Sequence, residues 1–324
     1  MRVNDDLATL FQRLRAGDRR ALSRALTLIE NGHPQAAGLV DAVDQPSDAA
    51  RRVGITGPPG AGKSTLVAAM ADAHRAAGRS VAVLAVDPSS PDGRGAILGD
   101  RTRMSRHYLD PGVFIRSMGT RGALGGLSDA AGEALVLLNA AGFDEVIVET
   151  VGTGQVELDV TGHAGTVVLT LMPGGGDSVQ AMKSGILEVA DIIVVNKGDL
   201  EGAKQLVNEV RQALHLRRPA DWKIPVVRTD ALTGEGIDAL LTAIQAHRDY
   251  LRSSPGLPGL RRQVLANQIV AQAVALLRVE ARRLLDSPAG DTLIQDLQHG
   301  ALSPRAAAER LAGMIANTPQ PQEA

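Results

Sequence analysis

Short apolar segments alternate with helical segments through the middle of the chain, from about residue 51 to residue 252. Each apolar segment is almost continuously hydrophobic, which is typical of strands that are buried on both faces of a parallel sheet. The helical segments between them, such as 64–77, 128–141 and 201–214, predict a doubly wound, mostly parallel α/β sheet with helices on both faces. The predicted strands are residues 53–56, 81–86, 113–115, 146–148, 166–171, 192–195 and 225–227.

Different patterns flank this α/β region. Residues 5–44 carry leucines and an isoleucine at three- and four-residue steps, which predict helices. Beyond a serine-, proline- and glycine-rich stretch, residues 262–285 predict a long helix, and Ser303-Pro304 predicts the start of another. The predicted segments are an N-terminal helical extension (1–50), the α/β domain (51–252), a linker (253–261), a C-terminal helical dimerisation arm (262–317) and a disordered tail (318–324).

The composition narrows the possible functions. A formal net charge of -2 and an aromatic content of 2% give no reason to expect binding to nucleic acid or to an anionic membrane. The chain has no cysteine, which excludes disulfides, iron–sulfur clusters and thiolate metal sites. The N-terminal sequence lacks the apolar core of a signal peptide, and no apolar run approaches the ~18 residues of a membrane-spanning helix. We therefore expect a cytoplasmic protein.

The strongest chemical signal is the segment 57–64, which fits the phosphate-binding pattern G-x-x-x-x-G-K-[ST] between a predicted strand and a predicted helix. Its glycines let backbone N–H groups surround phosphate oxygens, and the helix N-terminus favours negative charge. Lys63 is expected to bridge the β- and γ-phosphates, and the Ser64 hydroxyl to bind Mg²⁺. The expected nucleotide contacts are Gly57, Pro58, Pro59, Gly60, Ala61, Gly62, Lys63, Ser64 and Thr65.

The segment Asn196-Lys197-Gly198-Asp199 predicts a preference for guanine, because it follows a predicted strand whose end faces the same edge of the sheet. Asp199 can accept hydrogen bonds from the guanine N1–H and amino group, whereas adenine has no such amino group. The stem of Lys197 can lie along the base. Without that context the string would more often be a simple turn. In a second base loop at 229–234, the residues Asp230, Ala231 and Leu232 are expected to bring a backbone N–H to guanine O6.

Three acids are candidates for the metal and γ-phosphate side of the site. Asp87 and Glu149 end predicted strands, and Asp100 lies in a loop rich in glycine and arginine. The string from Glu149 to Gly152 is a variant of the D-x-x-G element, in which the acid reaches the Mg²⁺ shell and the glycine N–H reaches the γ-phosphate. Any one acid could instead be a strand-end cap or a surface charge. The expected metal ligands are Ser64, Asp87, Asp100 and Glu149.

The catalytic set lacks a water-orienting glutamine, because Thr153 occupies the position where Ras-like enzymes carry one. This predicts slow intrinsic hydrolysis that another group must accelerate. Lys183, at the end of a glycine-rich stretch, is the best candidate, although it could be an ordinary solvated lysine. The arginines Arg94, Arg101 and Arg103 are the next candidates. The expected catalytic residues are Lys63, Asp87, Asp100, Glu149, Gly152 and Lys183.

Taken together, the motifs resemble those of the MeaB/ArgK-type P-loop GTPases, which share a broad (SIMIBI-like) class with signal-recognition and metallochaperone GTPases. The matching strings are GPPGAGKSTL, VDPSS, GAILGDRTRM, ETVGTGQ, VNKGDL and ALTGEGI, within residues 17–250, with a weaker match at 302–311. The resemblance implies a homodimer that binds GTP and GDP with Mg²⁺. It also implies that the chain gates cofactor loading and protects or reactivates a cobalamin-dependent acyl-CoA mutase.

The resemblance further implies roles for individual residues. Asp87, Asp100 and Glu149 match the acids that bind Mg²⁺ and take part in catalysis in the family. Asp177 and Lys183 match a mobile third switch segment that responds to the mutase. Methylmalonyl-, isobutyryl-, ethylmalonyl- and hydroxyisobutyryl-CoA mutases all remain candidate partners. Three features depart from the family pattern: Ser178-Val179, Asp230, and a C-terminal arm that lacks the expected tryptophans and is Ala/Leu/Val/Arg-rich over residues 262–285.

Other GTPase and kinase classes fit less well. A metallochaperone would need a Cys/His metal site, and the chain has no cysteine. A transport-system kinase conflicts with the guanine-selecting string, and a signal-recognition GTPase would need a methionine-rich domain that the seven dispersed methionines do not form.

Overall fold

The computed structural model of the 324-residue chain describes most of the α/β region and parts of both flanks. The described residues are 7–33, 35–43, 51–87, 104–119, 129–150, 162–174, 187, 190–215, 221–253, 262, 266, 269–270, 273–274, 277–278 and 280–317. They fall into two compact units, Met1–Val264 and Leu265–Ala324. Nowhere in the described part is there a helix with the length and apolar character that crossing a membrane requires.

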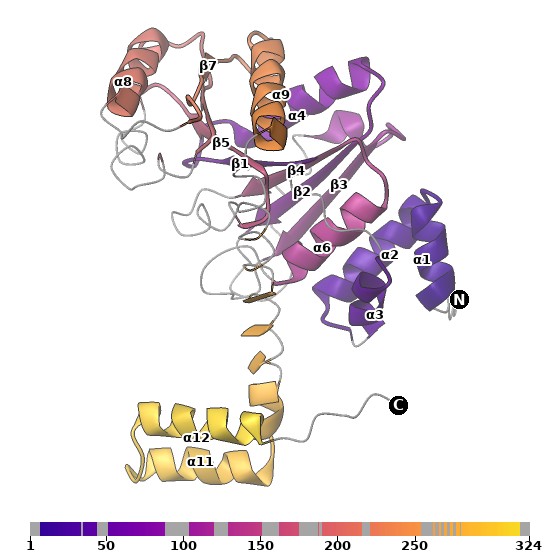
Figure 1. Cartoon of the computed structure of the whole chain (residues 1–324), viewed down its shortest axis with the longest axis vertical. Helices are drawn as coiled ribbons and strands as arrows, with labels where there is room; N and C mark the ends of the chain where they lie inside the picture. Colours follow the sequence, from indigo (N-terminus) through magenta and orange to yellow (C-terminus); the bar gives the residue numbers. More distant parts are fainter. Residues whose placement is uncertain are drawn as a thin grey trace. The chain divides into compact units, whose positions relative to one another are not determined.

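The first unit is built on a parallel sheet of seven strands in the order β3-β2-β4-β1-β5-β6-β7 (Figure 1). Every strand pair is parallel, which confirms the predicted doubly wound α/β fold. All carboxyl ends therefore meet at one edge of the sheet, where ligands bind in folds of this type. The strands are β1 (Arg52–Thr56), β2 (Val81–Asp87), β3 (Val113–Gly119), β4 (Glu145–Thr150), β5 (Thr166–Leu171), β6 (Ile192–Val195) and β7 (Val226–Arg228).

Helices cover both faces of the sheet. On one face, α4 (Lys63–Ala76) and α9 (Ile237–Ser253) pack on a core that includes Val53, Val83 and Ile147. On the other face, α6 (Asp129–Ala140) packs on Leu84 and Val148, while α8 (Ala203–His215) covers the β5–β7 end. Successive strand residues thus enter opposite cores, and this two-sided burial is why most strand positions are apolar.

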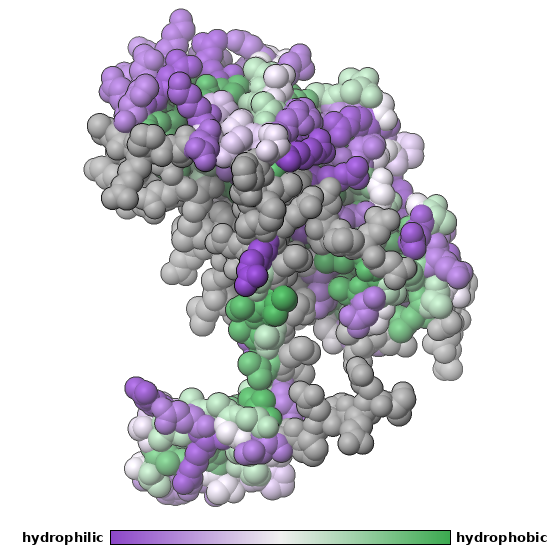
Figure 2. Space-filling model, viewed as in Figure 1, coloured by the Kyte–Doolittle hydropathy of each residue, from purple (hydrophilic) through white to green (hydrophobic). Residues whose placement is uncertain are grey.

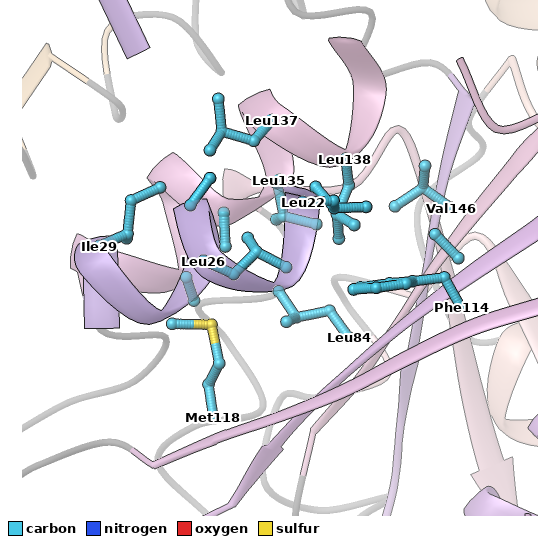
Figure 3. Packing of buried hydrophobic residues seen from close by; sticks show 14 of the residues in the cluster. Leu22, Leu26, Ile29, Leu84, Phe114, Met118, Leu135, Leu137, Leu138 and Val146 are labelled. Carbon is cyan, nitrogen blue, oxygen red and sulfur yellow. The ribbon is translucent and has the colours of Figure 1, made fainter. Parts of the chain in front are cut away.

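The N-terminal helices α1 (Leu7–Arg15), α2 (Arg19–Glu30) and α3 (Gln35–Asp41) pack against the α6 face. Figure 3 shows Leu22, Leu26 and Ile29 of α2 among the side chains of α6 and the sheet. Asp18 caps α2 by accepting hydrogen bonds from the Arg20 and Ala21 N–H groups. The segment expected as a helical extension thus completes the core over β2 and β3.

In the second unit, the helices α11 (Pro288–Gln298) and α12 (Pro304–Ala316) contact each other. Each begins with a serine cap followed by proline, so the predicted helix start at Ser303 is confirmed. The described residues between 262 and 285, where a long helix was expected, are all helical. The expected linker, apart from residue 253, and the expected tail lie outside the described residues.

Candidate nucleotide-binding site

The phosphate-binding loop connects the end of β1 to α4, and two glycines fix its path. Gly57 has φ 139°, and a Cβ atom on it would lie 2.1 Å from the Thr170 carbonyl oxygen of β5. Gly62 caps α4 with φ 86° and would place a Cβ 2.5 Å from the Asn196 amide nitrogen. A side chain at Gly57 would therefore collide with β5, and one at Gly62 with the Asn196 side chain, so glycine is required at both positions.

Lys63 lies within this loop and is buried. Its ammonium donates hydrogen bonds to the carbonyl oxygens of Gly57 (2.7 Å) and Pro58 (3.1 Å). Because the carbonyls satisfy part of the charge, the ammonium is held beside the α4 N-terminus, where helix N–H groups favour an anion. This position is compatible with the predicted contact between Lys63 and the β- and γ-phosphates.

Ser64 connects α4 to β4. Its hydroxyl donates a 2.6 Å hydrogen bond to Glu149 Oε1, and both side chains are buried. A hydroxyl and a carboxylate are oxygen donors, which is the ligand chemistry that Mg²⁺ prefers. The two residues therefore fit the predicted metal site, although no group of three or more His, Asp or Glu side chains that could hold a metal occurs among the described residues.

The remaining predicted catalytic and metal residues are described only in part. Asp87 ends β2, the strand beside β4, so its backbone lies at the same sheet edge as Glu149. Its side chain, and the whole of Asp100, Gly152 and Lys183, lie outside the described residues. The alternative cations Arg94, Arg101 and Arg103 lie outside them as well. The predictions for this group therefore stay predictions.

Asn196 connects the phosphate loop to the second base loop. Its amide nitrogen donates to the Ala61 carbonyl oxygen (2.9 Å), and its amide oxygen accepts from the Thr229 hydroxyl (3.1 Å) and the Ala231 N–H (3.2 Å). Only 2% of the residue is exposed. The sequence motif predicts that Asn196 is a base-reading residue. The structure adds a positioning role, because one buried side chain joins two loops that are distant in sequence.

The other base-loop residues are arranged differently. Lys197 has φ 56°, the one positive value on a non-glycine residue in the described ranges, and its Nζ lies 3.3 Å from Met172 Sδ. This conformation turns the chain so that the Gly198 N–H donates to the Thr229 carbonyl oxygen at 2.8 Å. Asp199 is exposed at the end of this turn, as a residue that reads a base edge must be.

Asp230 organises its own loop. Its carboxylate accepts from the Leu232 N–H (3.0 Å) and the Thr233 hydroxyl (2.8 Å), and the Thr233 bond and then the Leu232 bond lower the pKa of Asp230 below its usual value. The Ala231 N–H already donates to Asn196. Asp230 therefore acts as a loop cap in this structure, while the contact of an amide with guanine O6 stays a prediction.

These motifs sit on neighbouring carboxyl ends of one parallel sheet, as a GTPase requires. The family model for the methylmalonyl Co-A mutase-associated GTPase MeaB matches residues 22–283. The chain belongs to the MeaB family. The family resemblance, the fold and the GTPase activity expected from the sequence are thereby confirmed.

Relatives and a solved structure agree with this assignment. A protein of Pyrococcus horikoshii named as a GTPase is 46% identical over 278 residues, which cover 84% of this chain and 88% of that protein. GTPase ArgK of Escherichia coli is 38% identical over 320 residues, which cover 95% and 96% of the two chains. The crystal structure of an LAO/AO transport system kinase is 32% identical with a TM-score of 0.69, covering 98% of this chain and 100% of that one.

Proposed function

We propose that this MeaB-family GTPase is a chaperone that gates cofactor loading of a cobalamin-dependent acyl-CoA mutase and protects or reactivates that enzyme. The observation that carries the proposal is the match over residues 22–283 to a family described by its association with methylmalonyl Co-A mutase. The connection that Asn196 makes between the two nucleotide loops supports it, because a chaperone of this kind must couple its bound nucleotide to its shape.

At the site, Ser64 and Glu149 would hold Mg²⁺ together with Asp87 and Asp100. Mg²⁺ bound there would supply positive charge against the β- and γ-phosphates, as in other P-loop enzymes. Lys63 binds the phosphate oxygens beside the α4 N-terminus, and Asp199 selects guanine. The buried Ser64–Glu149 hydrogen bond supports this arrangement, because it holds two oxygen donors together at the edge of the sheet.

Hydrolysis by the isolated chain is slow, because Thr153 cannot orient water as glutamine does. Unassisted sites of this kind turn over at about 10⁻⁴ to 10⁻² s⁻¹. The mutase accelerates the reaction by bringing Lys183 towards the charge that develops between the β- and γ-phosphates. A cation placed there only in the transition state raises the rate without tightening GTP binding.

The functional unit is a homodimer that forms through the arm at residues 262–317. Its described helical residues carry large apolar side chains that are 44–68% exposed in the single chain, and Figure 2 shows green, hydrophobic residues gathered along this segment. Apolar surface of this extent is seldom left bare on a monomer. The residues concerned are Ile269, Val270, Val274 and Leu277.

A cofactor-loading assay tests the chaperone function. Apo-mutase is mixed with adenosylcobalamin and the chain in the presence of GTP, a non-hydrolysable GTP analogue or no nucleotide, and the active holoenzyme is measured over time. We expect the rate or the fidelity of loading to depend on GTP hydrolysis. The matched control is Lys63→Ala, which should remove the nucleotide dependence. Loading that is the same with and without the chain would contradict the proposed function.

A further inference from the structure

The first unit has a cavity that lies far from the nucleotide-binding site. This cavity of about 520 Å³ opens between α2 and the amino end of β3, the edge strand of the sheet. We call it the basic hollow and define it by Arg19, Arg20, Ser23, Tyr108 and Phe114, which are among its lining residues. The nucleotide site lies at the carboxyl ends of the strands. The seven residues of β3 place its carboxyl end about 20 Å from its amino end, where the hollow lies.

The two arginines of the hollow form no ion pair with an acid among the described residues. The guanidinium of Arg19 donates to two neutral acceptors, the carbonyl oxygens of Asp110 (2.9 Å) and Val113, and lies 5.7 Å from the centre of the Phe114 ring. Arg20 is exposed and has no ion-pair partner among the described residues. None of the described residues that line the cavity is acidic. Its electrostatic character is therefore that of a site for a carboxylate or another anion.

The acids closest in sequence are committed elsewhere. Asp110 accepts from Arg75 at 2.9 Å and from the Gly112 N–H at 2.7 Å. Asp18 pairs with Arg13 at 2.9 Å and caps α2. These bonds fix the loop around the hollow and leave its arginines available to a partner.

The rim of the hollow exposes apolar surface on a loop that side-chain contacts hold in place. Tyr108 is 47% exposed and the adjacent Leu109 is 95% exposed. The loop that carries them is held by Arg75, which packs so closely on Gly112 that a Cβ there would lie 2.1 Å from the guanidinium carbon. An exposed leucine and tyrosine beside arginine, on a preorganised loop, are typical of a protein-binding surface, because tyrosine and arginine are enriched at binding hot spots and little order is lost on docking.

We propose that the basic hollow docks an acidic segment of the mutase, with a carboxylate beside Arg19 and Arg20 and an apolar side chain against Tyr108 and Leu109. This inference rests on the proposed function, because it assigns a surface to that partner. Docking here leaves the nucleotide site open. It also places the partner on the connection between β2 and β3, the same connection that carries Asp100.

The test is a calorimetric titration of the full chain into the purified mutase, for the parent and three variants. Arg20→Glu and Leu109→Ser change the hollow and its rim. The matched control is Arg211→Glu, which makes the same charge change at an exposed position of α8, beside β6 and β7 at the opposite edge of the sheet. Basal GTP hydrolysis and GTP affinity are measured on all four proteins as a check on folding, and they should be unchanged.

We expect Arg20→Glu and Leu109→Ser each to weaken mutase binding about tenfold or more, a loss of about 1.4 kcal/mol, with the control within about twofold. Raising NaCl from about 50 to about 300 mM should weaken the parent more than Arg20→Glu. Equal binding by the parent and both variants would overturn this proposal alone. Absence of binding by the parent would overturn the proposed function and this inference with it.

Discussion

The connection made by Asn196 leads to a quantitative prediction. Asn196→Ala removes three buried side-chain hydrogen bonds, to Ala61, Thr229 and Ala231, all between 2.9 and 3.2 Å. Each such bond contributes about 0.5–1.5 kcal/mol, so the free energy of unfolding should fall by about 2–4 kcal/mol. GDP and GTP should also bind more weakly, by about tenfold or more, because the nucleotide must then order both loops itself.

The assay is urea unfolding of the nucleotide-free protein together with calorimetric binding of GDP. Thr229→Val is the graded control, because it removes only the 3.1 Å bond to the Asn196 amide oxygen and keeps the shape of the side chain. Thr229→Val should lower the free energy of unfolding by about 1 kcal/mol. The reasoning is refuted if the free energy of unfolding of Asn196→Ala lies within about 0.5 kcal/mol of the parent value and the variant binds GDP with unchanged affinity.

Three further predictions concern the loop, the pH dependence and the arm. Gly57→Ala should abolish measurable GTP binding in a filter assay, because its Cβ would meet Thr170 at 2.1 Å, whereas Gly38→Ala, with an ordinary 3.5 Å contact, should bind normally. Burial raises the pKa of Asp191 from 3.8 to about 7, so the folded state keeps a proton in this window and stability falls as the pH rises through it. Asp191→Asn should therefore gain stability relative to the parent between those pH values in urea titrations, and a constant difference would contradict this. Truncation at Ser254 should give a monomer by light scattering that still binds GTP, and a truncated dimer would exclude the arm as the interface.

Much of the fold could be predicted because parallel strands buried on both faces are apolar throughout. β3 is one strand that departs from this pattern. The expected strand stopped at Ile115, since Arg116 and Ser117 interrupt the apolar run, yet β3 continues to Gly119. An edge strand tolerates polar residues, and pairing with β2 along its whole length extends it. Arg116 itself pairs with Glu30 of α2, a contact that no local pattern in the sequence encodes.

The site could be predicted by residue type, but its internal contacts could not. The phosphate loop and the guanine string are contiguous motifs, and their place at strand ends follows from the fold. The contacts of Asn196 join segments that meet only in three dimensions, so the motif identifies the residue without its partners. Arg52 shows the same limit. It was expected to precede the first strand, but it lies fully buried within β1, where it donates to the His163 carbonyl oxygen at 3.2 Å.

The most direct test of the central claim is the rate of GTP hydrolysis with and without the purified cobalamin-dependent mutase, for the parent and Lys183→Ala. We expect slow hydrolysis by the isolated parent, and acceleration by the mutase with little change in GTP affinity. Lys183→Ala should keep the GTP affinity and lose most of the acceleration. A parent whose hydrolysis rate does not respond to any candidate mutase would contradict the claim that this GTPase serves one.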